Sequence, residues 1–380
     1  MNFELTKEQL QVQEVAREFA QEKLLPGVIE RDESSEFPVG LYKEFGKTGA
    51  YGLPYGEEFG GAGGSYMDYV LTVEEISKVD ASFGIAYSVN TSLYGGSIMN
   101  SSAPDELKKK YIAPITYGEK IGSFGLTEHT AGSDAAGQTT VAVKEGDSYV
   151  INGQKCFNTN GPLADFSIIY SLTDPELGTK GMCAFVVDKG TPGFTVGKIE
   201  NKMGIRTAQV SELYLDHVRV PAENMIAQPG EGFKLAMKTL DGGRIGVAAQ
   251  GLGIAKGAFE IARKYMMERQ QFGRPIAKQQ YLAFKMAELQ TKIQQAEMMV
   301  YRAAWMKDNG KPYSVPAAMA KMTATNVAME VTTEAVQMLG GNGYMREYHV
   351  ERMMRDAKIT QIYEGTNEIQ KLVISGQLFR

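Results

Sequence analysis

The alternation of apolar and polar positions divides the chain into a helical part, a β-rich part and a second helical part. In the first part, residues 1–120, apolar side chains from Leu10 to Ala20 recur at roughly helical spacing. Thr6 and Gln9 precede them with the spacing of a capping box, which predicts that a helix begins there. Further helices are expected over residues 65–78 and 105–112, with a Gly-rich loop at 56–64.

The middle part, residues 121–228, contains short runs of β-branched and aromatic residues. Turn residues such as Asn152-Gly153 separate these runs. Strands at this spacing favour an all-β sandwich or barrel. The expected strands cover residues 139–143, 148–151, 166–170, 183–187 and 212–215.

The last part, residues 229–380, returns to helical spacing in long segments joined by short loops, which is typical of an antiparallel bundle. We therefore expect an α+β fold of three domains, with limits 1–120, 121–228 and 229–380. The long helices are predicted near residues 232–268, 279–308, 314–339 and 347–359.

Composition narrows the class of protein. The 380 residues are 43% hydrophobic and 22% charged with a net charge of −5, and no basic run stands out, which argues against nucleic acid as the main partner. No apolar stretch approaches the ~18 residues of a membrane span, and the N-terminus lacks the pattern of a signal peptide. Cys156 and Cys183 are too few for a disulfide scaffold or an iron–sulfur cluster, which favours the cytoplasm. The three histidines show no ligand spacing, so we expect no metal.

Two segments of the β-rich part have the residue types of a ligand site. Small and hydroxyl residues over 124–134 would let the backbone approach a ligand closely, but the same pattern suits a capped surface loop. In Phe157-Asn158-Thr159, an aromatic ring and a hydroxyl two residues apart could stack on a second ring and bond its edge. An aromatic residue near a strand end is more often part of the core, so neither segment decides alone.

Two further segments lie in the last part. Gly242 and Gly243 fall inside a predicted helix, where each costs about 1 kcal/mol relative to alanine, so another helix or a ligand should approach closely. Asp241 and Arg244 flank them, and the two side chains could simply pair. Glu364 follows an apolar and aromatic stretch, where burial would raise its pKa as a general base requires. A carboxylate that caps the last helix explains Glu364 equally well.

Taken together, these segments resemble the acyl-CoA dehydrogenase family across essentially the whole chain. The resemblance rests on Gly-Leu-Thr-Glu and Ala-Gly-Ser-Asp within residues 125–134, Asp-Gly-Gly-Arg-Ile-Gly at 241–246, Arg-Gln-Gln-Phe-Gly at 269–273, Gln-Met-Leu-Gly-Gly-Asn-Gly-Tyr at 337–344 and Ile-Tyr-Glu-Gly-Thr at 362–366. It is nearest to the short-chain, butyryl-CoA branch of anaerobic bacteria. The family fold that it implies is an N-terminal helical domain, a middle β-barrel and a C-terminal four-helix bundle.

The resemblance implies FAD as the cofactor and assigns site residues by motif. Glu364 matches the catalytic base. Positions expected to contact FAD within one chain are Phe124, Leu126, Thr127, Gly132, Ser133, Phe157, Asn158, Thr159, Thr366 and Glu368. Positions expected to reach the FAD of a neighbouring subunit, and hence to imply a tetramer built as a dimer of dimers, are Arg269, Phe272, Gln279, Gln280, Gln337, Gly340 and Gly341. Positions expected to contact substrate are Ser133, Asp241, Gly242, Arg244 and Gly365.

The implied reaction removes a proton from the α-carbon of an acyl-CoA thioester and a hydride from its β-carbon, or runs in reverse on a 2-enoyl-CoA. The sequence does not choose between these directions. The electron partner would be an electron-transfer flavoprotein, with electron bifurcation to ferredoxin as one variant. A non-catalytic flavoprotein scaffold is the competing reading, and an acyl-CoA oxidase is disfavoured by the short chain.

Three positions depart from the family pattern. His129 replaces a usual proline and is most simply a tolerated surface substitution. Asn158 replaces an apolar residue, and its side chain could point away from the flavin. Gly251 stands where relatives tend to have alanine. Its missing methyl raises the hypothesis of a larger acyl pocket, for an aryl-propenoyl thioester such as caffeoyl-CoA.

Overall fold

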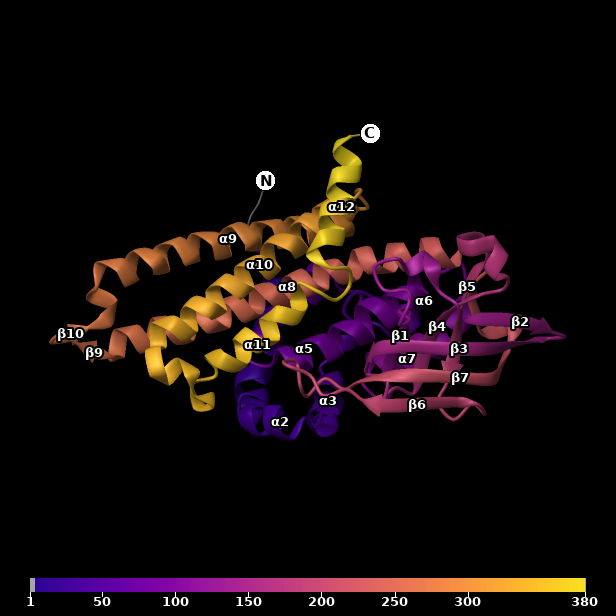
Figure 1. Cartoon of the computed structure of the whole chain (residues 1–380), viewed down its shortest axis with the longest axis horizontal. Helices are drawn as coiled ribbons and strands as arrows, with labels where there is room; N and C mark the ends of the chain where they lie inside the picture. The colour runs from indigo at the N-terminus through magenta and orange to yellow at the C-terminus, as the bar shows by residue number, and fades with distance from the viewer. Residues whose placement is uncertain (1–3, 380) are drawn as a thin grey trace.

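The computed structural model describes residues 4–379, in the predicted order of helices, strands and helices. Figure 1 shows an elongated molecule with the strands at one end and the long C-terminal helices extending to the other. The first part contains α1 (Lys7–Phe19), α2 (Val28–Ser34), α3 (Val39–Gly46), α4 (Tyr66–Ser77), α5 (Ala81–Ser88), α6 (Gly96–Asn100) and α7 (Asp105–Thr116), with π-helical turns at Ala20–Leu24 and Val89–Gly95.

Capping boxes fix where two of these helices begin. The predicted box at α1 is confirmed, because the Gln9 N–H donates to the Thr6 hydroxyl and the Thr6 N–H donates to the Gln9 side chain. Ser65 and Asp68 form a second box at α4. Every residue of α4 is buried, so this helix is the centre of the N-terminal part and packs on α8.

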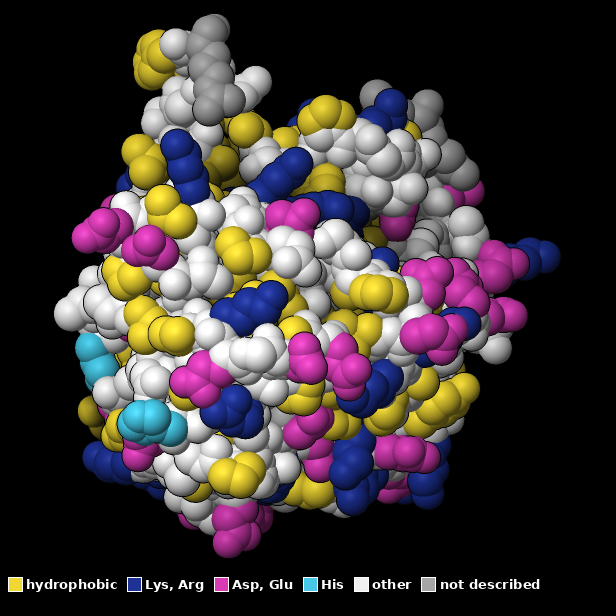
Figure 2. Space-filling model, turned by 90° about the vertical axis from the view of Figure 1, so that its right-hand side faces the viewer, with side chains coloured by type: hydrophobic (Ala, Val, Ile, Leu, Met, Phe, Trp, Pro, Cys, Tyr) yellow, Lys and Arg dark blue, Asp and Glu magenta, His cyan; other side chains and the backbone are white. Residues whose placement is uncertain are grey.

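The middle part is one eight-stranded sheet in the order β6-β7-β3-β2-β4-β5-β8, with β1 paired in parallel to β4. A single residue pair, Val141 with Leu172, joins β2 to β4, so the sheet has two halves. Side chains of both halves share one core, yet β6 and β8 do not pair, so the predicted barrel is open on that side within the described residues. The strands are β1 (Gly122–Gly125), β2 (Val141–Glu145), β3 (Ser148–Thr159), β4 (Phe166–Leu172), β5 (Met182–Asp188), β6 (Phe194–Ile199), β7 (Val210–Pro221) and β8 (Met225–Ala227). Figure 2 views this end of the molecule and shows acidic and basic side chains interspersed on it.

The C-terminal helices form a bundle in which α8 and α10 lie along each other. The bundle contains α8 (Gly232–Glu268), α9 (Gln280–Asp308), α10 (Ser314–Leu339), α11 (Val350–Thr360) and α12 (Asn367–Leu378). The hairpin of β9 (Gln270–Gln271) and β10 (Arg274–Pro275) links α8 to α9 at the end farthest from the sheet (Figure 1). None of the helices in residues 4–379 is long and apolar enough to cross a membrane. The residue limits of the three domains stay a prediction.

Gly251 belongs to the contact between α8 and α10. A Cβ at this position would lie 3.3 Å from the carbonyl oxygen of Ala324 and 3.4 Å from the Cα of Thr325. The missing methyl therefore lets two helix backbones approach each other. The hypothesis that Gly251 enlarges an acyl pocket is wrong, because that space is filled by α10.

Candidate active site

Glu364 lies in the short loop between α11 and α12. It has a φ of 53° and Gly365 has a φ of 90°, so two consecutive residues adopt the left-handed conformation. Both carboxylate oxygens of Glu364 are buried, and neither finds a hydrogen-bond partner within residues 4–379. A buried polar group without a partner is costly, which makes this carboxylate a candidate for chemistry.

The surroundings of Glu364 adjust its proton affinity. Burial raises the pKa of Glu364 to about 7, and the positive charges of Lys321 and Arg244 oppose part of that rise. A carboxyl group with a pKa near neutrality can both accept and return a proton at physiological pH. These are the requirements of a reversible general base.

Helix α8 has no side chains at the point where the Glu364 carboxylate approaches it, because Gly242 and Gly243 lie there. A Cβ at Gly243 would lie 2.0 Å from Glu364 Oε2 and 2.7 Å from Leu93 Cδ2. At Gly242, a Cβ would lie 3.0 Å from the Tyr66 hydroxyl. The close approach predicted from these helical glycines is therefore present, and protein side chains make it.

Asp241 and Arg244 form the ion pair that their spacing allowed, at 2.6 Å. Ser314 donates a second hydrogen bond to Asp241. Burial raises the pKa of Asp241, and Arg244 opposes that rise. Arg244 is buried and its Nε has no partner within the described chain, so a donor remains for a ligand. Contact with substrate stays a prediction for both residues.

The two segments expected to hold the flavin lie side by side in the β domain. The Cys156 N–H donates to the Thr127 carbonyl at 2.9 Å, which joins β3 to the loop after β1. Phe157 has a φ of 57° and is 68% exposed, and Thr159 two residues later is half-buried. An exposed aromatic ring on a constrained backbone, next to a hydroxyl, suits a planar ligand.

A buried ion pair holds the loop that carries Gly132 and Ser133. The Lys155 ammonium, with no exposed surface, lies 2.7 Å from Glu128 Oε1. The Glu128 carboxylate also accepts hydrogen bonds from the N–H and hydroxyl groups of Thr139 and Thr140. Burial alone would raise the pKa of Glu128, but these partners lower it to about 2. Both ends of the loop are thus fixed, whereas Ser133 itself is exposed.

Two of the family departures have ordinary structural roles. Asn158 is buried, and its amide donates to the Ser211 carbonyl of β7, so this side chain points into the sheet. His129 is exposed and lies 2.7 Å from Glu212. The Asn158 amide nitrogen and the His129 ring thus have β-domain partners, whereas the Asn158 side-chain oxygen is buried without one among residues 4–379.

The residues expected to reach a neighbouring subunit are not brought to this site. They lie around the β9–β10 hairpin and the end of α10, at the opposite end of the molecule from the sheet (Figure 1). Phe272 is 94% exposed, and the others are also exposed except half-buried Gln279. Their contact with the FAD of a neighbouring subunit stays a prediction.

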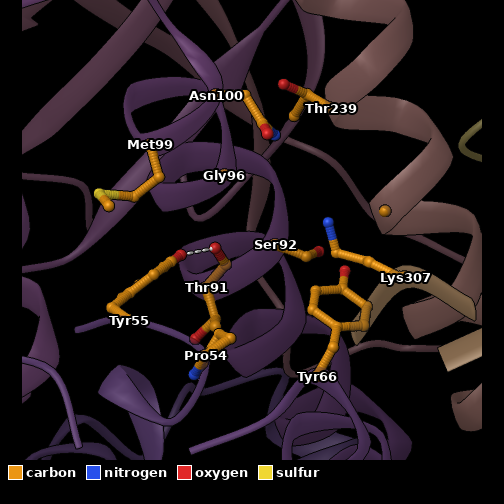
Figure 3. A pocket seen from close by; sticks show the side chains of 11 residues that line it. Pro54, Tyr55, Tyr66, Thr91, Ser92, Gly96, Met99, Asn100, Thr239 and Lys307 are labelled. Carbon is orange, nitrogen blue, oxygen red and sulfur yellow. Dashed lines mark hydrogen bonds between the residues drawn. The ribbon is translucent and has the colours of Figure 1, made fainter. Parts of the chain in front are cut away.

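A cavity of about 160 Å³ borders the same turn of α8. Figure 3 shows Lys307 beside Tyr66, and Thr239 beside Asn100. The Lys307 ammonium lies 4.5 Å from the centre of the Tyr66 ring, and burial lowers its pKa to about 8. The hydroxyls of Tyr66 and Thr239 have no partner within residues 4–379. The cavity thus contains polar groups without partners within the described chain, and it lies where the N-terminal helices meet α8.

Comparison with known proteins identifies the family. The models of the acyl-CoA dehydrogenase N-terminal, middle and C-terminal domains match residues 6–119, 123–218 and 230–379. The chain belongs to the acyl-CoA dehydrogenase family, whose members are FAD-dependent oxidoreductases that act on CH–CH groups.

Individual relatives match over the full length. The chain is 54% identical to the short-chain specific acyl-CoA dehydrogenase of Clostridium acetobutylicum and 49% identical to that of Megasphaera elsdenii, covering 100% of each. The structure of butyryl-CoA dehydrogenase from Megasphaera elsdenii matches with a TM-score of 0.98 at 49% identity, over 100% of both chains. A chain from work on the electron transferring flavoprotein of Acidaminococcus fermentans matches with a TM-score of 0.99 at 51% identity, again over 100% of both.

Proposed function

We propose that this chain is a short-chain acyl-CoA dehydrogenase that also works in reverse as an enoyl-CoA reductase. The buried, unpartnered Glu364 carboxylate that packs against Gly243 of α8 carries the proposal. In oxidation it removes a proton from the α-carbon of the thioester, and in reduction the protonated acid returns one. FAD supplies the two-electron chemistry at the β-carbon.

The described residues fit FAD. One surface of the β domain carries the exposed ring of Phe157, the Thr159 hydroxyl and the loop around Ser133, which is fixed at both ends. We propose that this surface holds the cofactor, and that Arg269, Phe272, Gln280 and the glycines after α10 complete the site of a neighbouring subunit in a tetramer. The relatives and the matching structures support an electron-transfer flavoprotein as the electron partner. The reduced state expected of two buried cysteines supports the cytoplasm.

The face of α8 beyond Glu364 favours a short acyl chain. One turn after Gly243, the hydroxyl of Tyr69 would lie 2.1 Å from a Cβ at Gly246. One turn further, Gln250 donates to the Ala81 carbonyl and accepts from the Tyr363 hydroxyl. We propose that these side chains limit the length of the acyl chain.

Replacing Gln250 by alanine is expected to shift the preference toward longer acyl-CoA substrates. Each additional methylene accommodated changes kcat/KM by about 10-fold, because it is worth roughly 1–3 kcal/mol in a fitted apolar pocket. Some stability should be lost, since the Tyr363 hydroxyl and the Ala81 carbonyl lose their partner. Comparing kcat/KM for butyryl-CoA and hexanoyl-CoA in both proteins checks this, and an unchanged ratio would contradict the assignment of the pocket.

The proposed function is tested by anaerobic titration of the purified yellow protein with butyryl-CoA. We expect the flavin band to bleach and then to recover when crotonyl-CoA is added in excess, because the two directions use the same residues. Reduction of added electron-transfer flavoprotein should follow. A colourless protein that takes up no FAD would favour a scaffold, and rapid oxygen uptake would favour an oxidase.

A further inference from the structure

Lys321 is a buried charge in a helix whose other buried side chains are small or apolar. It lies in the first half of α10 and has no exposed surface. Its ammonium donates to the Gly365 carbonyl at 2.8 Å and to the Asn367 side-chain oxygen at 3.1 Å. It therefore reaches from the bundle into the loop that carries Glu364.

Further side chains hold the Glu364 loop against α10. Gln370 donates to the same Gly365 carbonyl at 2.7 Å. The Asn367 amide donates to Thr325 of α10 and to Asn326. The left-handed residues Glu364 and Gly365 are thus tied to α10 immediately beside the carboxylate.

The charges around Glu364 are unequal in effect. Arg244 approaches from α8 but is already paired with Asp241 at 2.6 Å. Lys321 approaches from α10, and no carboxylate lies within 4.0 Å of its ammonium in residues 4–379. The other titratable groups that act on Glu364 or Lys321 are Tyr66 and Tyr69 of α4, Tyr363 of the loop and Glu368 of α12.

Lys321 and Glu364 each oppose the effect of burial on the pKa of the other. Burial lowers the pKa of Lys321 to about 7, and the charge of Glu364 counteracts that fall. Lys321 in turn opposes the rise that burial imposes on the pKa of Glu364. Among the charged groups, Lys321 has the larger opposing effect on the pKa of Glu364, and Glu364 has the largest on that of Lys321.

We propose that Lys321 is a positioning residue that clamps the catalytic loop and supplies positive charge that favours the ionised form of Glu364. The inference rests on the proposed function. Oxidation of an acyl-CoA needs the carboxylate form of Glu364, whereas reduction of an enoyl-CoA needs the acid form. Lys321 thereby sets the pH at which the site changes from one task to the other.

Three substitutions in the holoenzyme separate the clamp from the charge. Lys321→Gln keeps a donor to Gly365 and removes the charge, Lys321→Arg keeps the charge, and Lys321→Met removes both. Lys43→Met, at an exposed position of α3, is the control for loss of a lysine elsewhere. The readout is the pH profile of flavin bleaching by butyryl-CoA.

We expect the rising limb for Lys321→Gln and Lys321→Met to move to higher pH by about one unit, with bleaching roughly 5- to 10-fold slower at neutral pH and recovering in alkali. The profiles of Lys321→Arg and Lys43→Met should stay close to native. A limb that does not move in Lys321→Gln would overturn the proposal. A loss that is uniform at every pH would also overturn it, because it would indicate a purely structural role.

The same shift can be measured without turnover. Infrared difference titration of the Glu364 carboxyl stretch, assigned with Glu364→Gln, needs neither substrate nor bound FAD. A higher pKa of Glu364 in Lys321→Gln than in the native protein supports the proposal even if no acyl-CoA is oxidised. Titration curves that coincide overturn it. The inference about Lys321 and the proposed function can therefore fail separately.

Discussion

Replacing Glu364 by glutamine is expected to lower turnover of butyryl-CoA by about 10³- to 10⁴-fold while FAD remains bound, since general-base catalysis supplies about 10²–10⁴. The carboxylate is buried without a partner, so an amide of the same size fits with little loss of stability. Steady-state kinetics with an electron-transfer flavoprotein, together with the flavin spectrum, measures both quantities.

Glu364→Asp is the matched control for this substitution. It keeps the acid but withdraws it by about one methylene, and we expect activity between that of the native protein and that of Glu364→Gln. Turnover by Glu364→Gln within about 10-fold of native would mean that another group removes the proton.

Replacing Gly243 by alanine is expected to lower turnover by about 10²- to 10³-fold, because the new methyl group displaces the base from its reacting position. The Cβ would lie 2.0 Å from Glu364 Oε2 and 2.7 Å from Leu93 Cδ2, so at least one of these groups must move. FAD should still bind, because its proposed surface lies on the β domain.

Gly251→Ala is the control for Gly243→Ala, since it changes another buried glycine of the same helix. Its Cβ would meet the Ala324 carbonyl at 3.3 Å, which requires a small adjustment between α8 and α10. Turnover should stay within about 3-fold of native, with helix propensity contributing up to about 1 kcal/mol in favour of alanine. Equal losses for the two variants would indicate that damage to α8, rather than displacement of Glu364, lowers the rate.

Much of the fold could be predicted because the local sequence shows where the long helices begin and end. The predicted limits of α8 and α10 agree with the structure, since each segment is long, periodic and free of proline in its centre. Strands β1, β6 and β8 were not predicted, because β1 contains two glycines, β6 has Gly197 in its centre and β8 has three residues. Helix α12 was also missed, since it projects from the bundle and buries few of its apolar residues (Figure 1).

Site residues that belong to a short sequence motif could be predicted. Site residues that act through contacts between distant parts of the chain could not. Glu364, Asp241 and Arg244 stood out from short segments. Lys321 gave one signal, a lysine in a helix rich in alanine and methionine, but only the fold shows that its ammonium reaches Gly365. Gly251 shows the converse, because its sequence departure suggested a pocket and the structure gives it a helix contact.

The most direct test of the account is single-turnover bleaching of the flavin by butyryl-CoA deuterated at C2, measured across the neutral pH range. We predict a primary isotope effect on the native protein, a rate that rises through an apparent pKa of about 7, and no measurable bleaching by Glu364→Gln on the same timescale. Bleaching of Glu364→Gln at the native rate would contradict the claim that Glu364 handles the α-proton.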